Sequence, residues 1–231
     1  MKEILTAMLA ALGRGERVVL CSIFASSGSS PRGAGAKMAV FADGRTLGTV
    51  GGGAVEMLSA QRALDAIRTG SNELKRYDLH PNDVSDIGMI CGGQVTVYFQ
   101  LFMPENAADT AVLQRWCEGL SRDEDLWLLL SLDGERVSEF RVLTRAEIPQ
   151  EKKELFTAKA VWRGECYVEP LVRAGKVCIF GGGHVGRALV PVLAAVGFRV
   201  VLFDNRAALA RPENYPAANE VIFGDFQHIY D

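Results

Sequence analysis

Apolar side chains in the first 170 residues follow the period of a helix in some segments and that of a strand in others. Residues 4–12 show helical spacing, whereas residues 95–101 alternate apolar and polar side chains, as expected of a half-buried strand. By the same criteria we expect helices over 54–68 and 107–120, and strands over 17–25, 37–42, 45–50, 73–79, 126–132 and 135–143. Residues 161–168 are expected to form a last strand or a hairpin around Arg163-Gly164. This order predicts a mixed α/β domain over residues 1–170.

The pattern changes after Pro170, where a short linker leads to Gly175. A buried strand over 176–180, a helix from about residue 184 to Gly197 and a second strand over 198–203 follow, and residues 221–223 can supply a third strand. We therefore expect residues 175–231 to form a partial Rossmann-like, doubly wound unit, which has about six strands when complete. Such a half unit is expected either in a fragment of a longer protein or with a partner over its open sheet edge.

Three glycine-rich segments separate the elements of the first hundred residues: 26–35, 51–53 and 88–93. Gly51, Gly52 and Gly53 follow a strand and precede a helix, so their backbone can adopt positive φ and the helix's free N–H groups can face an anion. A tight connection whose glycines serve only packing is the alternative. Because each segment is followed by a regular element, the three together predict one ligand surface built from loops.

The second unit carries the G-x-G-x-x-G pattern directly after its first strand. In such a turn Gly181 allows the tight bend, Gly183 lets a pyrophosphate approach and Gly186 lets the helix pack closely on the strand. Asp204 ends the second strand, where an acid would bind a ribose 2′-hydroxyl. Arg206 could instead bind a 2′-phosphate, so NAD and NADP both stay open as cofactors.

Net charge, apolar runs and the cysteine and histidine counts argue against several classes of function. The net charge of −3 with mixed signs gives no basic surface for nucleic acid, and no 18-residue apolar run predicts a membrane span. The first twelve residues do not resemble a signal peptide. Five cysteines without a C-x-x-C pair favour a reducing, cytoplasmic setting, and three scattered histidines predict no metal cluster.

The segments 27–38 and 48–56, followed by Cys91-Gly92-Gly93, resemble the motifs of the XdhC/CoxI family. The Gly181–Gly186 motif with residues 204–206 is similar to the C-terminal Rossmann domain of that family. The resemblance covers nearly the whole chain. It implies an accessory protein, a chaperone without turnover of its own, that binds molybdenum cofactor and protects it during sulfuration. Such a chaperone then passes the cofactor to a molybdenum hydroxylase such as xanthine dehydrogenase, and sulfuration implies a cysteine desulfurase as a further partner.

Molybdenum cofactor is an anionic pterin with a dithiolene and a phosphate, and the resemblance places it at the N-terminal loops. Arg32 and Lys37 offer positive charge, and an arginine suits bidentate contact with phosphate. Glu56 lies in the first turn of the predicted helix, where the helix dipole alone favours a carboxylate. The full set of candidate cofactor-binding residues is Ser30, Arg32, Lys37, Gly51, Gly52, Gly53, Glu56, Gly92 and Gly93, with Gly181, Gly183, His184, Gly186 and Asp204 for a nucleotide.

Cys91 is the candidate for direct contact with molybdenum or transferred sulfur, because it is the cysteine flanked by a glycine-rich loop. A thiolate is a soft donor that suits both roles. The alternative is a small buried apolar residue. Asp78 and His80 are secondary candidates, and His184 is expected to pack or to touch a phosphate.

Two functions compete at this point. The first is the cofactor chaperone; the second is an NAD(P)-dependent oxidoreductase that uses the Rossmann unit. No acid–base pair is positioned for the second function, and it leaves the N-terminal glycine loops unexplained. We also expect a homodimer or higher oligomer, because half a doubly wound sheet leaves apolar surface uncovered.

Overall fold

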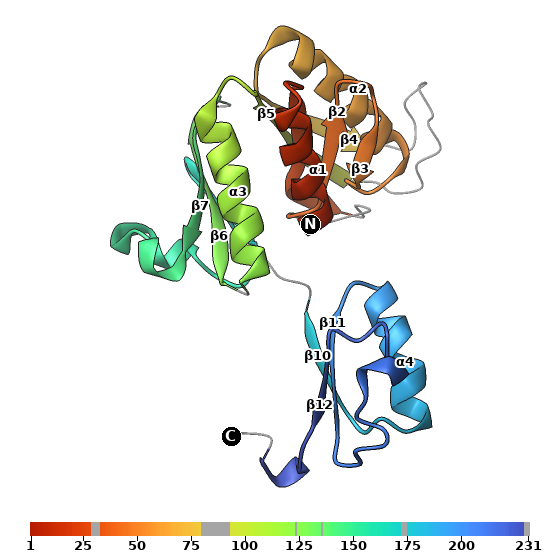
Figure 1. Ribbon diagram of the computed structural model, residues 1–231. Coiled ribbons are helices and arrows are strands. Elements are labelled where there is room, and N and C mark those ends of the chain that lie inside the picture. Colours follow the sequence, from red (N-terminus) through yellow and green to blue (C-terminus); the bar gives the residue numbers. More distant parts are fainter. Residues whose placement is uncertain (29–32, 80–92, 123, 135, 172–174, 229–231) are drawn as a thin grey trace. The chain divides into compact units, whose positions relative to one another are not determined.

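The structure is a computed structural model and describes residues 1–28, 33–79, 93–122, 124–134, 136–171 and 175–228. It divides into two compact units, Met1–Leu171 (unit 1) and Val172–Asp231 (unit 2), and Figure 1 shows the elements of each. Unit 1 combines helices with antiparallel sheets, and unit 2 holds a parallel sheet, so the predicted α/β class is confirmed. In the part of the chain that is described, no helix is long and apolar enough to cross a membrane.

The elements of unit 1 follow the predicted order closely. Its helices are α1 (Lys2–Gly13), α2 (Gly53–Thr69) and α3 (Ala107–Ser121), with short 3-10 turns η1 (Arg145–Glu147) and η2 (Gln150–Leu155). Its strands are β1 (Val18–Gly28), β2 (Lys37–Phe41), β3 (Thr46–Gly48), β4 (Glu73–Leu79), β5 (Gly93–Phe102), β6 (Leu126–Asp133), β7 (Arg136–Thr144), β8 (Val161–Arg163) and β9 (Cys166–Pro170).

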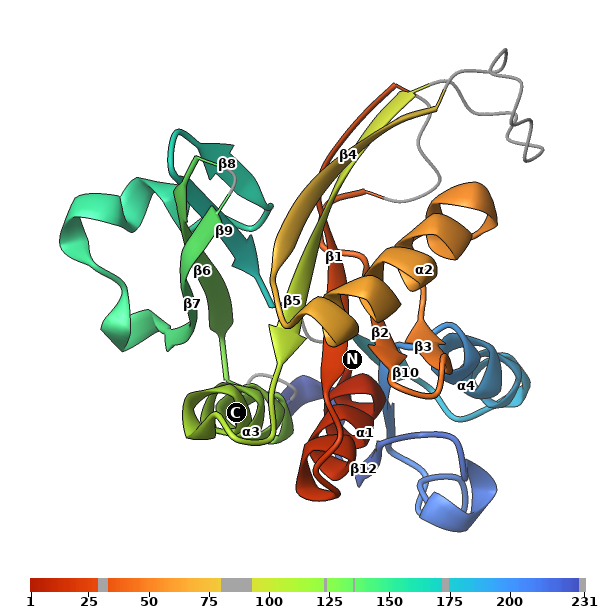
Figure 2. The same cartoon turned by 90° about the horizontal axis from the view of Figure 1, so that it is seen from above.

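The larger sheet of unit 1 has the strand order β3-β2-β1-β5-β4, and Figure 2 shows β1, β5 and β4 side by side. Helix α2 packs on one face through small residues, since Ala54, Ala63 and Ala66 are buried there. Leu58 and Leu64 of the same helix are only partly buried. Small side chains let the helix axis approach the sheet closely, which leaves larger ones at the margin.

The second face of that sheet is also covered, by α1, α3 and a smaller sheet of order β7-β6-β9-β8. The two sheets meet where Phe24 stacks on Tyr167, with ring centroids 4.1 Å apart. Strand β5 is consequently buried on both faces, and Tyr98, at 1% exposure, donates a hydrogen bond to Gln100 Oε1 at 2.8 Å. The prediction of a half-buried β5 is therefore wrong, because its polar residues bond to one another instead of to water.

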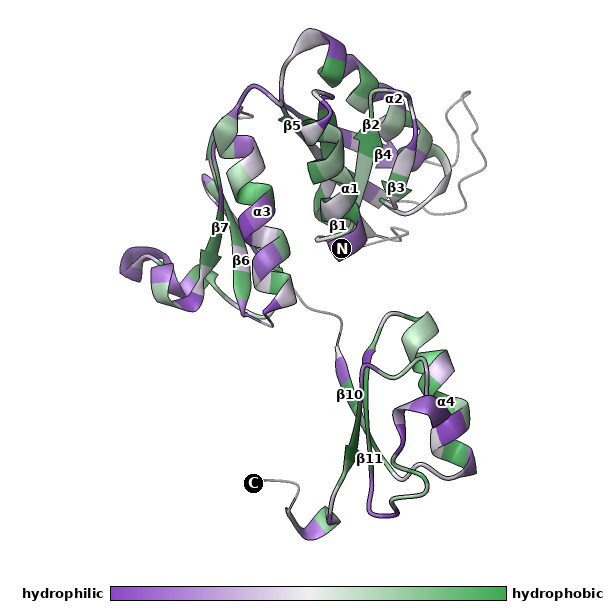
Figure 3. Ribbon diagram, viewed as in Figure 1, coloured by the Kyte–Doolittle hydropathy of each residue, from purple (hydrophilic) through white to green (hydrophobic). Residues whose placement is uncertain are grey.

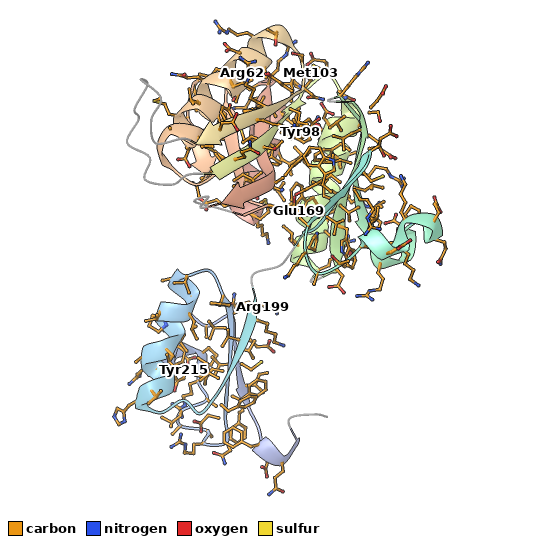
Figure 4. The ribbon with its side chains drawn as sticks, turned by 180° about the vertical axis from the view of Figure 1, so that it is seen from behind. Arg62, Tyr98, Met103, Glu169, Arg199 and Tyr215 are labelled. Carbon is orange, nitrogen blue, oxygen red and sulfur yellow. The ribbon has the colours of Figure 1, made fainter. Side chains whose placement is uncertain are left out.

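Unit 2 has β10 (Lys176–Phe180), α4 (His184–Ala195), β11 (Arg199–Asp204) and β12 (Glu220–Phe223), with the short turns η3 (Pro212–Asn214) and η4 (Phe226–His228). The strands are parallel in the order β10-β11-β12, and Figure 3 shows how apolar β10 and β11 are. The segment from β11 to β12 contains η3 where a doubly wound fold commonly has a helix. Tyr215, labelled in Figure 4, lies in that segment. Its ring packs in the core of unit 2 against residues that include Ile179 of β10 and Leu202 of β11.

Candidate functional site

The glycine-rich segments of unit 1 leave one edge of the larger sheet. Because neighbouring strands are antiparallel, β1, β3 and β4 all end at the edge where β2 and β5 begin. Gly28 pairs with Gly93, six residues beyond the pairing of Ser22 with Lys37, so β1 and β5 reach roughly 20 Å farther along the strand direction. The strand ends thus lie on one side of the sheet, but the tip formed by β1 and β5 extends farther out than the end of β3, and Ser30, Arg32, His80, Cys91 and Gly92 lie outside the described residues. The shared site stays a prediction.

The triple-glycine turn is closed by a carboxylate from its own helix. Gly51, Gly52 and Gly53 have φ values of 120°, 76° and 59°, which are costly for other residues. Oε2 of Glu56 accepts hydrogen bonds from the N–H groups of Val50 at 3.3 Å and Gly52 at 3.0 Å, and from the hydroxyl of Thr49. The Glu56 carboxylate thus already accepts hydrogen bonds from these donors, whereas the prediction left the N–H groups of the loop free for an external anion.

The start of that turn lies directly against strand β2. The Thr49 N–H donates to the Lys37 carbonyl at 3.0 Å. A Cβ on Gly48 would lie 2.5 Å from the same carbonyl oxygen and 2.6 Å from Ile4 Cδ1, so only glycine fits this approach. The sequence thus fixes the turn against β2, which holds Gly52 at the edge of the sheet.

The backbone is open on the outer side of these segments. A Cβ built on Gly33 or on Gly52 would meet no atom of the described residues within 4 Å, and Gly53 is exposed. A planar ligand could therefore approach the main chain at both places. Asp78, a secondary candidate at the end of β4, accepts a hydrogen bond from Gln94 Nε2 at 2.7 Å.

Lys37 does not face a ligand, contrary to the prediction. Its Nζ lies 2.8 Å from Oε2 of Glu169, and the two side chains are 1% and 7% exposed. The hydroxyl of Tyr167 donates to the same oxygen at 2.9 Å, and Figure 4 labels Glu169 on β9. Burial first, and then the neighbouring Glu169 carboxylate, raise the pKa of Tyr167, so its hydroxyl stays a donor. Lys37 is a structural cation between the two sheets.

Sequence reasoning missed Glu169 and Tyr167 as partners of Lys37. The expected strand ends at residue 168, whereas β9 continues to Pro170 and Glu169 is 5% exposed. Extending the predicted strand by one residue would place Glu169 on the same face as Tyr167, and this was the available signal, because buried carboxylates are almost always paired.

The described cysteines are not poised for chemistry at this edge. Cys21 is buried in β1, and burial raises the pKa of its thiol far above the ordinary value. Cys117 and Cys166 are partly buried, and Cys178 is exposed on β10. Over the described ranges, no cluster of three or more His, Cys, Asp or Glu residues is arranged to hold a metal ion.

The glycine motif of unit 2 has the geometry that its pattern predicts. Gly181 has a φ of 113°, and a Cβ on Gly186 would clash with the Gly181 carbonyl oxygen, so the close helix–strand approach needs glycine. His184 begins α4 and is exposed. A parallel sheet with this loop between its first strand and helix defines a Rossmann-type unit.

Asp204 does not stand free at the end of β11, contrary to the prediction. It is fully buried, and its carboxylate accepts hydrogen bonds from the Gly182 N–H at 2.6 Å and from the backbone and guanidinium of Arg206 at 2.7 to 2.9 Å. The Arg206 guanidinium first, with these N–H groups, holds the pKa of Asp204 well below its usual range, although burial acts in the opposite direction.

The chain therefore joins an antiparallel α/β unit with a glycine-rich sheet edge to a Rossmann-type unit, and comparison with known proteins identifies that combination. The model of the XdhC and CoxI family matches residues 11–78, and the model of the XdhC Rossmann domain matches residues 177–230. Together they span more than half of the chain, which belongs to the XdhC/CoxI family.

Two relatives from Escherichia coli (strain K12) share part of the sequence. The molybdenum cofactor insertion chaperone PaoD is 35% identical over 96 residues, which is 42% of this chain and 30% of PaoD. The protein YqeB is 34% identical over 82 residues, which is 36% of this chain and 15% of YqeB. The matches thus span less than a third of either relative.

A solved structure shares the fold over the full length of the chain. It is a crystal structure from Bacillus halodurans described as a xanthine dehydrogenase, with a TM-score of 0.76 and 21% identity. The match covers 100% of this chain and 70% of that one. At this identity the likeness concerns the fold alone.

Proposed function

We propose that this protein is a molybdenum-cofactor insertion chaperone for a molybdenum hydroxylase such as xanthine dehydrogenase. The observation that carries the proposal is the glycine-rich edge of the larger sheet, with open backbone at Gly33 and Gly52, in a chain of the XdhC/CoxI family. The description of PaoD as an insertion chaperone supports it. In this proposal the protein shields the cofactor during sulfuration by a cysteine desulfurase, works in the cytoplasm and then hands the cofactor over.

The position of Glu56 favours different contacts for the different parts of the cofactor in this proposal. A carboxylate already occupies the turn at Gly52, so a phosphate at that place would meet like charge. The pterin ring carries amino and amide N–H groups, and a carboxylate can accept hydrogen bonds from them. We therefore place the pterin edge at Glu56 and the open backbone of Gly52. The phosphate is assigned to Arg32 and the molybdenum or its sulfur to Cys91, both on the basis of sequence.

A retention assay on the purified chain tests this proposal. The protein is loaded anaerobically with molybdenum cofactor and passed through gel filtration, and the molybdenum and the pterin fluorescence of the protein peak are measured. We expect comparable amounts of both in the wild-type peak, and roughly tenfold weaker retention for Glu56→Gln, because a charge-assisted hydrogen bond is lost. No retention by folded wild-type protein contradicts the proposal.

Glu118→Gln is the matched control for Glu56→Gln. Glu118 is an exposed glutamate on α3, where it pairs only with Arg122 at 3.3 Å among the described residues, and its loss is expected to leave retention unchanged. Equal retention by folded Glu56→Gln and wild type would remove Glu56 from the site while leaving the chaperone function open to the other candidates.

We also propose that the protein forms a homodimer through unit 2. Val185, Leu189 and Val192 on α4 and Val196 at its C-cap are 73%, 42%, 59% and 67% exposed and recur at helical spacing, so they form an apolar stripe on the outer face of the helix. A second copy of the same stripe is its simplest cover. Light scattering at micromolar concentration is expected to give the mass of a dimer for wild type and of a monomer for Val192→Glu.

A further inference from the structure

A dinucleotide in a Rossmann-type unit needs three things from the protein. The N-terminus of the first helix must face the pyrophosphate, the glycine loop must be open to it, and the acid after the second strand must have a free oxygen for the ribose hydroxyls. Unit 2 supplies the helix and an open backbone at Gly183, where an added Cβ would meet nothing within 4 Å. Whether unit 2 can bind a dinucleotide therefore depends on the third requirement, the acid at the ribose position.

Asp204 stands at that position with both oxygens in use. Oδ2 accepts from the Gly182 N–H at 2.6 Å and from Arg206 Nη2 at 2.7 Å. Oδ1 accepts from the Arg206 N–H at 2.8 Å and from Arg206 Nε at 2.9 Å. A carboxylate has about four lone-pair sites, so these donors satisfy it. The guanidinium takes the place that a ribose diol would occupy.

Tyr215 closes the same loop from the other side. Its hydroxyl donates to the Gly182 carbonyl, and its ring is 3% exposed within the core of unit 2. A Cβ on Gly182 would clash with that hydroxyl and lie 3.0 Å from the ring's Cζ. Asp204 therefore holds the loop through the Gly182 N–H, and Tyr215 holds it through the Gly182 carbonyl. These two contacts fix the loop without a ligand.

We infer that Arg206 is a specificity-determining residue that occupies the ribose position of this Rossmann-type unit and excludes NAD and NADP from it. The bidentate contact with Asp204 also takes two of the donors with which Arg206 would bind a 2′-phosphate. A 2′-phosphate would in addition lie beside the Asp204 carboxylate. Both cofactor assignments from the sequence thus compete with the same internal ion pair, and an oxidoreductase function for unit 2 is not supported.

Titration of the full chain with NADH and NADPH, followed by nicotinamide fluorescence and by calorimetry, tests this inference. Wild type is expected to show no saturable binding below millimolar concentrations. Arg206→Ala frees one acceptor site on each Asp204 oxygen for a ribose diol, and we expect it to bind NADH at least about tenfold more tightly than wild type does. Arg211→Ala removes an exposed arginine from the same segment and is the matched control, expected to bind like wild type.

Two results would overturn the inference. One is micromolar binding of either nucleotide by wild type that is lost in Asp204→Asn. The other is a folded Arg206→Ala protein, verified by circular dichroism, that binds NADH no better than wild type. If Arg206→Ala does not fold, Arg206→Lys keeps the charge but loses the bidentate geometry, and a gain in NADH affinity is expected for it as well. No measurement here involves molybdenum cofactor, so the outcome is independent of the proposed chaperone function.

Discussion

The glycine turn at residues 48–53 in unit 1 and the one at residues 181–186 in unit 2 both lead from a strand into a helix, and both hold a carboxylate against their backbone. In unit 1 the carboxylate is Glu56, from the first turn of the same helix, and no cation among the described residues pairs with it. In unit 2 it is Asp204, from the next strand, and Arg206 completes its hydrogen bonds.

The sequence gives both turns a glycine-rich pattern that could bind a ligand, but the pairing of the carboxylate gives them different capacities to accept one. Glu56 uses one oxygen, Oε2, for its hydrogen bonds with Thr49, Val50 and Gly52, so among the described residues its other oxygen can still accept a hydrogen bond. Asp204 has no such capacity left. A glycine motif therefore indicates a ligand site only after the neighbouring carboxylate and its cation have been located.

The largest effect is expected at the buried ion pair that keeps Lys37 away from the first turn. Lys37→Met leaves the Glu169 carboxylate buried without its cation and should destabilise unit 1 by about 3–5 kcal/mol. The double variant Lys37→Met with Glu169→Leu removes both charges and should recover most of that loss. Urea unfolding measures both. A loss below about 1 kcal/mol for Lys37→Met would mean that Lys37 is free to serve a ligand.

An intermediate effect is expected at Asp204 and depends on pH. Because the folded pKa is depressed, the Asp204 contribution to stability is complete above the unfolded value of about 3.9 and is lost as the pH falls below it toward the folded pKa. Asp204→Asn should lower the stability of unit 2 at pH 7 by about 1–3 kcal/mol and flatten its decline in acid. Thermal unfolding followed by circular dichroism between about pH 2 and 7 checks this.

Glu213→Gln provides the comparison for Asp204→Asn, because Glu213 is an exposed acid in the same segment of unit 2. It should unfold like wild type at every pH. An acid profile of Asp204→Asn that follows the wild-type profile would show that Arg206 does not hold the carboxylate in solution.

The smallest effect on stability is expected for Cys91→Ser, which sharpens the assignment of the ligand to unit 1. The change should alter the free energy of unfolding by less than about 0.5 kcal/mol. Cofactor retention should nevertheless fall well below wild type, because a hydroxyl is not a soft donor. Cys117→Ser, at a partly buried position packed against the main core, should show the reverse pattern. Equal retention by Cys91→Ser and wild type would remove Cys91 from the mechanism.

The sequence was sufficient for the fold because local patterns carry most of it. Helical spacing over residues 4–12, 54–68 and 107–120 depends on neighbouring residues, and the structure has helices there. Burial of both faces of β5 could not be predicted in this way, since it depends on a sheet formed 30 to 70 residues later. The partner of Lys37 was missed for the same reason, because Glu169 lies 132 residues from Lys37. Arg206 is a near neighbour of Asp204, but the sequence does not decide whether its guanidinium binds Asp204 or a 2′-phosphate.

All three tryptophans of the chain, Trp116, Trp127 and Trp162, belong to unit 1, and unit 2 has none. Trp116 is 1% exposed, and Nζ of Lys37 lies 5.9 Å from its ring centroid. Intrinsic tryptophan fluorescence consequently reports on unit 1 alone and is sensitive to the ion pair beside Trp116, whereas far-ultraviolet circular dichroism records both units. A single denaturant titration read by both signals can resolve whether the two halves unfold together or in sequence, without any label.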